Sequence, residues 1–297
     1  MFLIGCSWKE NHKTKSISTG DTITKVLFLD SAGKLPENSR PSSTLAIIVK
    51  DKTYIINAGK LFLQRFALGN KSGLIKENIT DVRNFFFTDL QSDLSAGIPD
   101  LIFVKMIVGT SETRIFGPPG SQSLINTILQ EYVDGFTVEG FSLQPNVSDY
   151  NISINTISEG EVFSDNLIKV NSFSVNRSNL KNSYGYKFKT PDKVIVLAGD
   201  VSYSASIAEN CKECDILIHS VYSTDGLNNI SESSRSYQKE FHTSVEELAA
   251  IAEVSKPRLL ILYNQLYYGV SDEDLLRELS NYYKGDVVSA KAYDIFE

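Results

Sequence analysis

The chain has 297 residues, of which 42% are hydrophobic and 22% are charged, and its formal net charge is −7. This composition excludes a chain that is mostly disordered, and the length suffices for one large layered domain. The negative balance and the absence of long Lys/Arg runs exclude the basic face that a phosphate-tracking nucleic-acid binder carries. No apolar stretch is long enough to span a bilayer, so we expect no transmembrane segment.

The first 22 residues are predicted to form a polar tail. Phe2–Cys6 reads FLIGC, which is similar to the end of a bacterial lipoprotein signal, although the apolar region that should precede it is missing. If the start is truncated, the chain is expected to be an extracytoplasmic lipoprotein tethered by Ser7–Thr22. Otherwise a cytoplasmic location is expected.

Residues 23–297 are predicted to form a single α/β domain. In its first part, TKVLFLDSAG is typical of a strand, and Leu45–Val49 with Tyr54–Asn57 is typical of a hairpin. A short helix over Leu61–Leu68 is expected to stop at Gly69. The apolar segment VRNFFFTD predicts a buried strand, and a helix over Ile98–Val108 follows.

The second part continues this alternation. A strand ends in GPPG, a helix is expected over Ser121–Tyr132, and Phe136–Phe173 is predicted to be rich in strands. YGYKFKTPDKVIVL predicts another hairpin, while CDILIHS and PRLLILYN predict buried strands. Ser244 and the glutamate three residues later form a capping-box pattern for a helix through Val254. The last helix is expected to begin at Ser271 and to stop by Gly285.

The cysteines exclude a disulfide scaffold, because there are only three. Cys211 and Cys214 form one CxxC pair, which cannot complete a four-ligand zinc site. We expect this spacing to be coincidental, with a redox pair as the alternative.

Four predicted buried strands end in polar residues, and strand ends at one edge of a sheet are where α/β proteins place their sites. These ends are Thr88–Asp89, Gly199–Asp200, His219–Ser220 and Tyr263–Asn264.

In order, these segments resemble motifs of the metallo-β-lactamase superfamily, in its ribonuclease-Z-like and arylsulfatase-like branch, which includes cyclic-nucleotide phosphodiesterases. TDLQSDLSAGIPDL, from Thr88 to Leu101, corresponds to the metal motif THxHxDHxxGxPDL, and AGDV, HSVY, HTS and LLILYNQL match later motifs. The resemblance implies an αββα four-layer sandwich, a binuclear zinc or manganese centre and, as in many relatives, a homodimer. The family's metal-ligand slots then hold Asp89, Gln91, Asp93, Leu94, Asn176, Asp200 and Asn264.

The histidines that such a centre requires are missing. The chain contains only His12, His219 and His242, and His12 lies in the polar tail. Leu94 cannot bind a metal, and amide side chains are poor zinc ligands. We therefore predict a catalytically inactive protein that binds a small-molecule or nucleotide-like ligand, or a partner, and needs no cofactor.

The alternative is a metal-dependent hydrolase of phosphodiesters or related esters with a remodelled site. Its candidate metal ligands are side chains that carry oxygen atoms, which suit Mg²⁺ or Ca²⁺ better than zinc. They are Asp89, Gln91, Asp93, Asn176, Asp200 and Asn264. Asp93, His219 and His242 are the candidate catalytic residues, with His242 as a general acid. If the site holds no metal, the carboxylates need a cation nearby, and Arg177 is a candidate.

The GPPG loop is the candidate ligand-binding segment. The resemblance places Gly117, Pro118, Pro119 and Gly120 beside the site. In any protein, the same sequence would also form a rigid turn.

Overall fold

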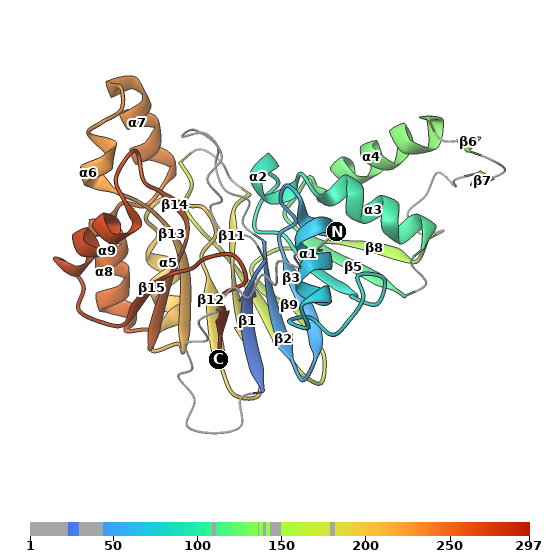
Figure 1. Cartoon of the computed structure of the whole chain (residues 1–297), viewed down its shortest axis with the longest axis horizontal. Helices are drawn as coiled ribbons and strands as arrows, with labels where there is room; N and C mark the ends of the chain where they lie inside the picture. The colour runs from blue at the N-terminus through green and yellow to red at the C-terminus, as the bar shows by residue number, and fades with distance from the viewer. Residues whose placement is uncertain are drawn as a thin grey trace, which may run out of the picture.

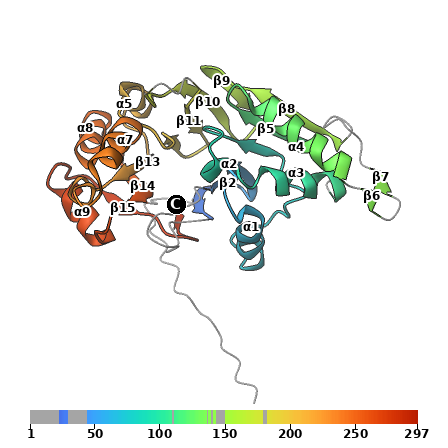
Figure 2. The same cartoon turned by 90° about the horizontal axis from the view of Figure 1, so that it is seen from above.

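The computed structural model of the chain describes residues 23–29, 44–108, 111–135, 137–138, 141–142, 150–178 and 182–297. The predicted tail at 1–22 lies outside these residues. Two seven-stranded sheets face each other, and helices cover their outer faces (Figure 1). Seen from above, the two halves of the sandwich lie side by side (Figure 2).

The first sheet has the strand order β16-β1-β2-β3-β4-β5-β8. Its strands are β1 (Thr24–Phe28), β2 (Leu45–Val49), β3 (Lys52–Ile56), β4 (Asn84–Phe86), β5 (Thr113–Gly117), β8 (Ile152–Thr156) and β16 (Ile295–Phe296). The predicted β2–β3 hairpin is confirmed. Its two-residue turn, Lys50–Asp51, has positive φ at both positions, which is the geometry that joins two twisted strands most closely.

The second sheet has the order β15-β14-β13-β12-β11-β10-β9. Its strands are β9 (Gly160–Ser164), β10 (Lys169–Ser174), β11 (Tyr184–Lys189), β12 (Val194–Leu197), β13 (Ile216–Tyr222), β14 (Leu259–Leu266) and β15 (Val287–Ser289). Strands β12, β13, β14 and β15 are parallel, so their carboxyl ends meet at one edge. A separate short pair is formed by β6 (Thr137–Val138) and β7 (Phe141–Ser142).

Three apolar cores separate the layers. One lies between the sheets, with Phe86, Tyr186 and Ile218 among its members. The other two lie under the helices on either outer face. The helices are α1 (Phe62–Lys71), α2 (Ser92–Ser95), α3 (Ile98–Ile107), α4 (Ser121–Gly135), α5 (Ala205–Cys211), α6 (Thr224–Leu227), α7 (Glu232–Phe241), α8 (Val245–Ser255) and α9 (Asp272–Ser280). The predicted αββα four-layer sandwich is therefore confirmed.

Three predicted helix ends were wrong. Helix α4 continues past Tyr132 to Gly135. Helix α1 continues through Gly69 to Lys71, and Gly69 packs closely against Leu29 and Ile75, where a larger side chain would crowd the core. Helix α9 ends at Ser280, before Gly285. The capping box at Ser244 is confirmed, with both of its hydrogen bonds present. Helices α2, α5, α6 and α7 were not predicted.

Cys211 and Cys214 form a disulfide at the end of α5. Both are buried in the core between the second sheet and helix α8. This pairing corrects the expectation that their spacing is coincidental.

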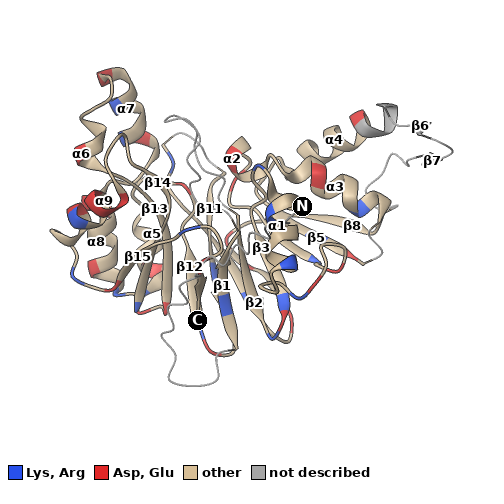
Figure 3. Ribbon diagram, viewed as in Figure 1, with Lys and Arg blue, Asp and Glu red and all other residues tan. Residues whose placement is uncertain are grey.

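Charged side chains are spread over the fold. Lys and Arg positions are interspersed with Asp and Glu along the ribbon (Figure 3). Within the described ranges, no helix is long and apolar enough to cross a membrane.

Candidate functional site

The loop after β4 brings the first polar side chains to the sheet edge. Asn57 follows β3 in the left-handed region, with φ of 59°, which asparagine tolerates better than most residues. Its Oδ1 accepts from the Thr88 backbone N–H at 3.0 Å. Asp89, which follows Thr88, accepts at Oδ1 from the Gln91 N–H at 2.7 Å. The turn between β4 and α2 therefore fixes the Asp89 carboxylate.

Arg177 lies at the centre of the site. Its side chain is 0% exposed. Nη1 donates to Asp89 Oδ2 at 2.7 Å, and Nη2 donates to Gln91 Oε1 and to Asp200 Oδ2, both at 2.9 Å. The guanidinium thus joins the loop after β4 in the first sheet to the loop after β12 in the second.

Asp200 connects this guanidinium to a histidine. Gly199, just after β12, has φ of +86°, a backbone conformation that favours glycine and turns the chain at the strand end. Asp200 Oδ1 lies 2.7 Å from His242 Nδ1, and His242 is 1% exposed. Thr243 then donates to the Val201 carbonyl oxygen, which fixes the segment before α8. We call Asp89, Gln91, Arg177, Asp200 and His242 the Arg177 cluster.

The cluster has an excess of negative charge. Burial raises the pKa of Asp89 to about 6, even though Arg177 and the Gln91 N–H favour the carboxylate. The charges of Asp200 and Asp93 raise it further. One guanidinium therefore faces more than one buried carboxylate.

Three neighbouring side chains have buried polar atoms without partners. Within the described part of the chain, His219 Nε2, the Tyr263 hydroxyl and both polar atoms of Asn264 make no hydrogen bond, although His219 Nδ1 donates to the Ser220 carbonyl oxygen at 2.6 Å. Burial lowers the pKa of His219 to about 4, so its imidazole is neutral at pH 7. Burial, then the charges of Asp200, Asp89 and Asp93, hold the pKa of Tyr263 well above its usual value. We call His219, Tyr263 and Asn264 the unpartnered group.

The other positions that the resemblance assigns to metal ligands lie in different surroundings. Asn176 is exposed, and its side chain donates to the Tyr203 carbonyl oxygen at 3.4 Å, outside the Arg177 cluster. Leu94 is a core residue of α2. Asp93 is 8% exposed in the first turn of the same helix, close enough to raise the pKa of Asp89. Asp89, Gln91, Asp200 and His242 thus come together, whereas Asn176 does not.

As arranged, these residues do not fit a binuclear zinc or manganese centre. Such a centre needs imidazoles and a free bridging carboxylate, but the Asp89 and Asp200 carboxylates both accept from Arg177. A divalent ion would also be repelled by the guanidinium between them. Over the ranges that the structure covers, no three His, Cys, Asp or Glu side chains are grouped to hold a metal ion. The same contacts oppose the Mg²⁺ or Ca²⁺ alternative.

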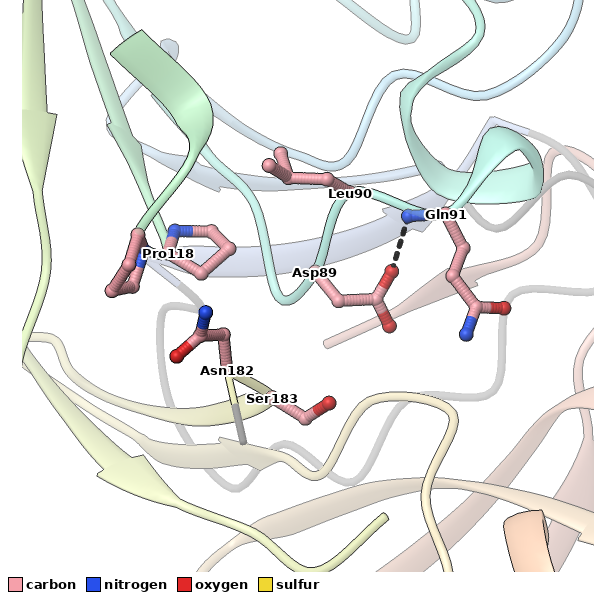
Figure 4. A pocket seen from close by; sticks show the side chains of 7 residues that line it. Asp89, Leu90, Gln91, Pro118, Asn182 and Ser183 are labelled. Carbon is pink, nitrogen blue, oxygen red and sulfur yellow. Dashed lines mark hydrogen bonds between the residues drawn. The ribbon is translucent and has the colours of Figure 1, made fainter. Parts of the chain in front are cut away.

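A cavity of about 270 Å³ opens beside Asp89. Figure 4 shows Pro118 of the GPPG loop at one side, Asp89 and Gln91 toward the other, and Asn182 and Ser183 on a further wall. Pro118 and Pro119 line it, while Gly120 has φ of +104° and leads into α4.

Asn182 and Ser183 were missed as candidates. Their one available signal was a position immediately before the YGYKF strand.

Comparison with known proteins shows distant sequence relatives. No protein-family model matches the chain. It is similar to the ribonuclease Z of Mycobacterium sp. (strain KMS), with 19% identity over 247 residues that cover 82% of this chain and 85% of that protein. The ribonuclease Z of Methanosarcina mazei is 21% identical over 284 residues, covering 81% of this chain and 87% of its own length.

Solved structures share the architecture. The metallo-beta-lactamase fold protein YhfI from Bacillus subtilis superposes with a TM-score of 0.68 at 16% identity, covering 92% of this chain and 99% of that one. The short form of human tRNase Z has a TM-score of 0.64 at 16% identity, covering 92% and 98%. At these identities, the structural likeness shows the fold alone.

Proposed function

We propose that this chain, which has the metallo-β-lactamase fold and is related to ribonuclease Z, binds a small ligand or a partner without metal-dependent hydrolysis. The observation that carries the proposal is Arg177, which hydrogen-bonds both Asp89 and Asp200 from a fully buried position. Its guanidinium supplies, from within the chain, part of the positive charge that two metal ions would supply.

A guanidinium cannot replace the chemistry of those ions. A metal ion lowers the pKa of its bound water and so generates hydroxide near neutral pH. Arginine stays protonated and offers N–H donors only, so it neither binds a water oxygen as a Lewis acid nor removes its proton. Arg177 can hold the loops after β4 and β12 in place, and that is the role we assign to it.

The remaining histidines do not restore a hydrolytic site. His219 is neutral and fully buried. His242 is 1% exposed, and its Nδ1 faces Asp200. A cavity beside Asp89, lined in part by the GPPG loop, is open to a ligand.

A hydrolysis assay with bis(p-nitrophenyl) phosphate tests the proposal. The protein is assayed separately with Zn²⁺, Mn²⁺, Mg²⁺ and Ca²⁺, and we expect no turnover above the same buffer without protein. Turnover with any ion that is lost in Asp200→Ala would overturn the proposal and support the remodelled hydrolase.

Three predictions about domain organisation, membrane attachment and oligomeric state stay predictions. They are the single domain over 23–297, the lipid tether through Cys6 and the homodimer. Metabolic labelling with a radioactive fatty acid tests the tether, with Cys6→Ser as the matched control. Light scattering of the purified protein tests the dimer.

A further inference from the structure

The cavity beside Asp89 has a mixed lining. Leu90, Pro118 and Pro119 provide apolar surface, while Asp89, Gln91, Asn182 and Ser183 provide polar groups. At about 270 Å³ it is near the lower end of the range for small-molecule pockets. Its size therefore favours a compact ligand with one apolar part and one polar end.

Ser183 supplies a hydroxyl to the lining of this cavity. The residue is 4% exposed, and its backbone oxygen accepts from the Val175 N–H. Because a hydroxyl oxygen has two lone pairs, Ser183 Oγ can accept a hydrogen bond from a ligand. Figure 4 shows Pro118 at one side of the cavity, and the Asp89 carboxylate and the Ser183 hydroxyl extending away from it.

The charges at the cavity favour a cationic ligand over an anionic one. Among the lining residues that the structure describes, Asp89 is the one that carries a charge. Arg177, the cation bonded to it, is fully buried and already donates to Asp89, Gln91 and Asp200. A phosphate would meet negative charge from Asp89 and Asp93, and the described part of the lining offers it no cationic side chain.

The start of helix α4 is the competing feature, because a helix N-terminus attracts anions. Gly120, directly before the helix, carries an N–H group, but the two residues of this turn that line the cavity, Pro118 and Pro119, carry none. The Ser121 N–H donates to the Pro118 carbonyl oxygen at 3.1 Å. The side of the turn that lines the cavity is thus poor in donors.

We infer that this cavity binds a small molecule with a protonated amine and a compact apolar part. The amine donates to the Asp89 carboxylate and to Ser183 Oγ, and the apolar part packs on Leu90, Pro118 and Pro119. Each Asp89 oxygen has a second lone pair for such a donor besides its present bond. This inference rests on the proposed function, because a metal at Asp89 would compete with the amine.

Three probes with the same ring test the inference by calorimetric titration of the full chain. They are phenethylamine as the cation, 2-phenylethanol as the neutral analogue and phenyl phosphate as the anion. We expect the amine to bind best and the phosphate at least about tenfold more weakly, which corresponds to ~1.4 kcal/mol. Equal or tighter binding of phenyl phosphate, or no binding of the amine at millimolar concentration, would overturn the inference.

Two variants locate the binding. Asn182→Lys places an ammonium at an exposed position in the lining and is expected to weaken amine binding about tenfold. Asn182→Gln is its neutral control and should bind the amine as wild type does. Ser183→Ala removes the hydroxyl that accepts from the amine and is expected to weaken amine binding severalfold, while Ser164→Ala, at an exposed position on β9, should not. Unchanged amine affinity in both Asn182→Lys and Ser183→Ala contradicts the assignment.

The metal content of the same samples separates this inference from the proposed function. If the protein is metal-free and prefers phenyl phosphate, the proposed function stands and the amine assignment is wrong. If the protein contains stoichiometric metal, the proposed function is wrong.

Discussion

The Arg177 cluster and the unpartnered group both include metal-ligand positions of the family resemblance, namely Asp89, Gln91 and Asp200 in the first and Asn264 in the second. The buried polar groups of the two sets nevertheless have different hydrogen-bond partners. In the cluster, Asp89 and Asp200 each receive an N–H of the same guanidinium. In the unpartnered group, His219 Nε2 and the amide of Asn264 are buried with no hydrogen bond in the described structure. Buried carboxylates require a cation, whereas neutral imidazole and amide groups cost much less when unpaired. The difference indicates that Arg177 is needed for stability and that His219 is not.

The largest expected effect is from Arg177→Met, which keeps most of the side-chain length but removes the charge. It removes the cation shared by two buried carboxylates and should lower the free energy of unfolding by about 3–5 kcal/mol. Urea denaturation measures it. Arg258→Met is the control, because the Arg258–Asp215 pair is largely exposed and should contribute less than ~1 kcal/mol. Equal effects of the two substitutions would mean that the guanidinium does not compensate the carboxylates.

The second prediction concerns the pH dependence of Asp89. Its pKa is about 6 in the folded chain, so the folded state keeps this proton at pH values where the unfolded state has released it. Stability relative to Asp89→Asn should therefore fall as the pH rises from about 4 to about 6, by on the order of 3 kcal/mol.

Denaturation of both proteins across this pH range measures the difference. Asp51→Asn, in the exposed β2–β3 turn, controls for the loss of one negative charge. A difference between wild type and Asp89→Asn that stays constant from pH 4 to pH 7 would contradict the assignment.

Removing Arg177 should also create affinity for a divalent cation. In Arg177→Met, the Asp89 and Asp200 carboxylates lose their shared cation, and Asp93 lies nearby. Mn²⁺ at a hundred times its Kd should then restore about 2–3 kcal/mol of stability to the variant. Thermal unfolding with and without Mn²⁺ measures this, and wild type should show no such shift. The same shift in wild type would mean that Arg177 does not exclude the metal.

The smallest expected effect is from His219→Leu. An apolar side chain of similar size removes the unpaired Nε2, which offsets the loss of the 2.6 Å bond from Nδ1 to the Ser220 carbonyl oxygen. The free energy of unfolding should therefore change by less than ~1 kcal/mol. A loss as large as that of Arg177→Met would contradict this prediction and show that the contacts of His219 stabilise the fold strongly.

Much of the site could be predicted from the sequence, because it depends on local patterns. Apolar runs identified the strands, and the polar residues that follow them identified Asp89 and Asp200. The apolar pattern did not reveal which residue after β10 has its side chain buried in the site. Side chains alternate along an extended chain, so a shift of one residue reverses the face. The family slot falls on Asn176, which is exposed, whereas its neighbour Arg177 is buried.

The cavity lining could not be predicted either. Asn182 and Ser183 approach Asp89 through the packing of one sheet against the other, and no sequence spacing encodes that contact. The end of α1 was misread for a related reason. Glycine is the residue type that typically ends a helix, but Gly69 lies within α1 and packs against Leu29 and Ile75.

The central claim is that Arg177 takes the place of the metals, and the metal content of the wild-type protein tests it most directly. The protein is purified without chelators from medium supplemented with zinc and manganese, and its metal-to-protein ratio is measured by mass spectrometry. We expect a ratio far below one ion per chain. A ratio of one or two zinc or manganese ions per chain would show that Arg177 does not replace the metals.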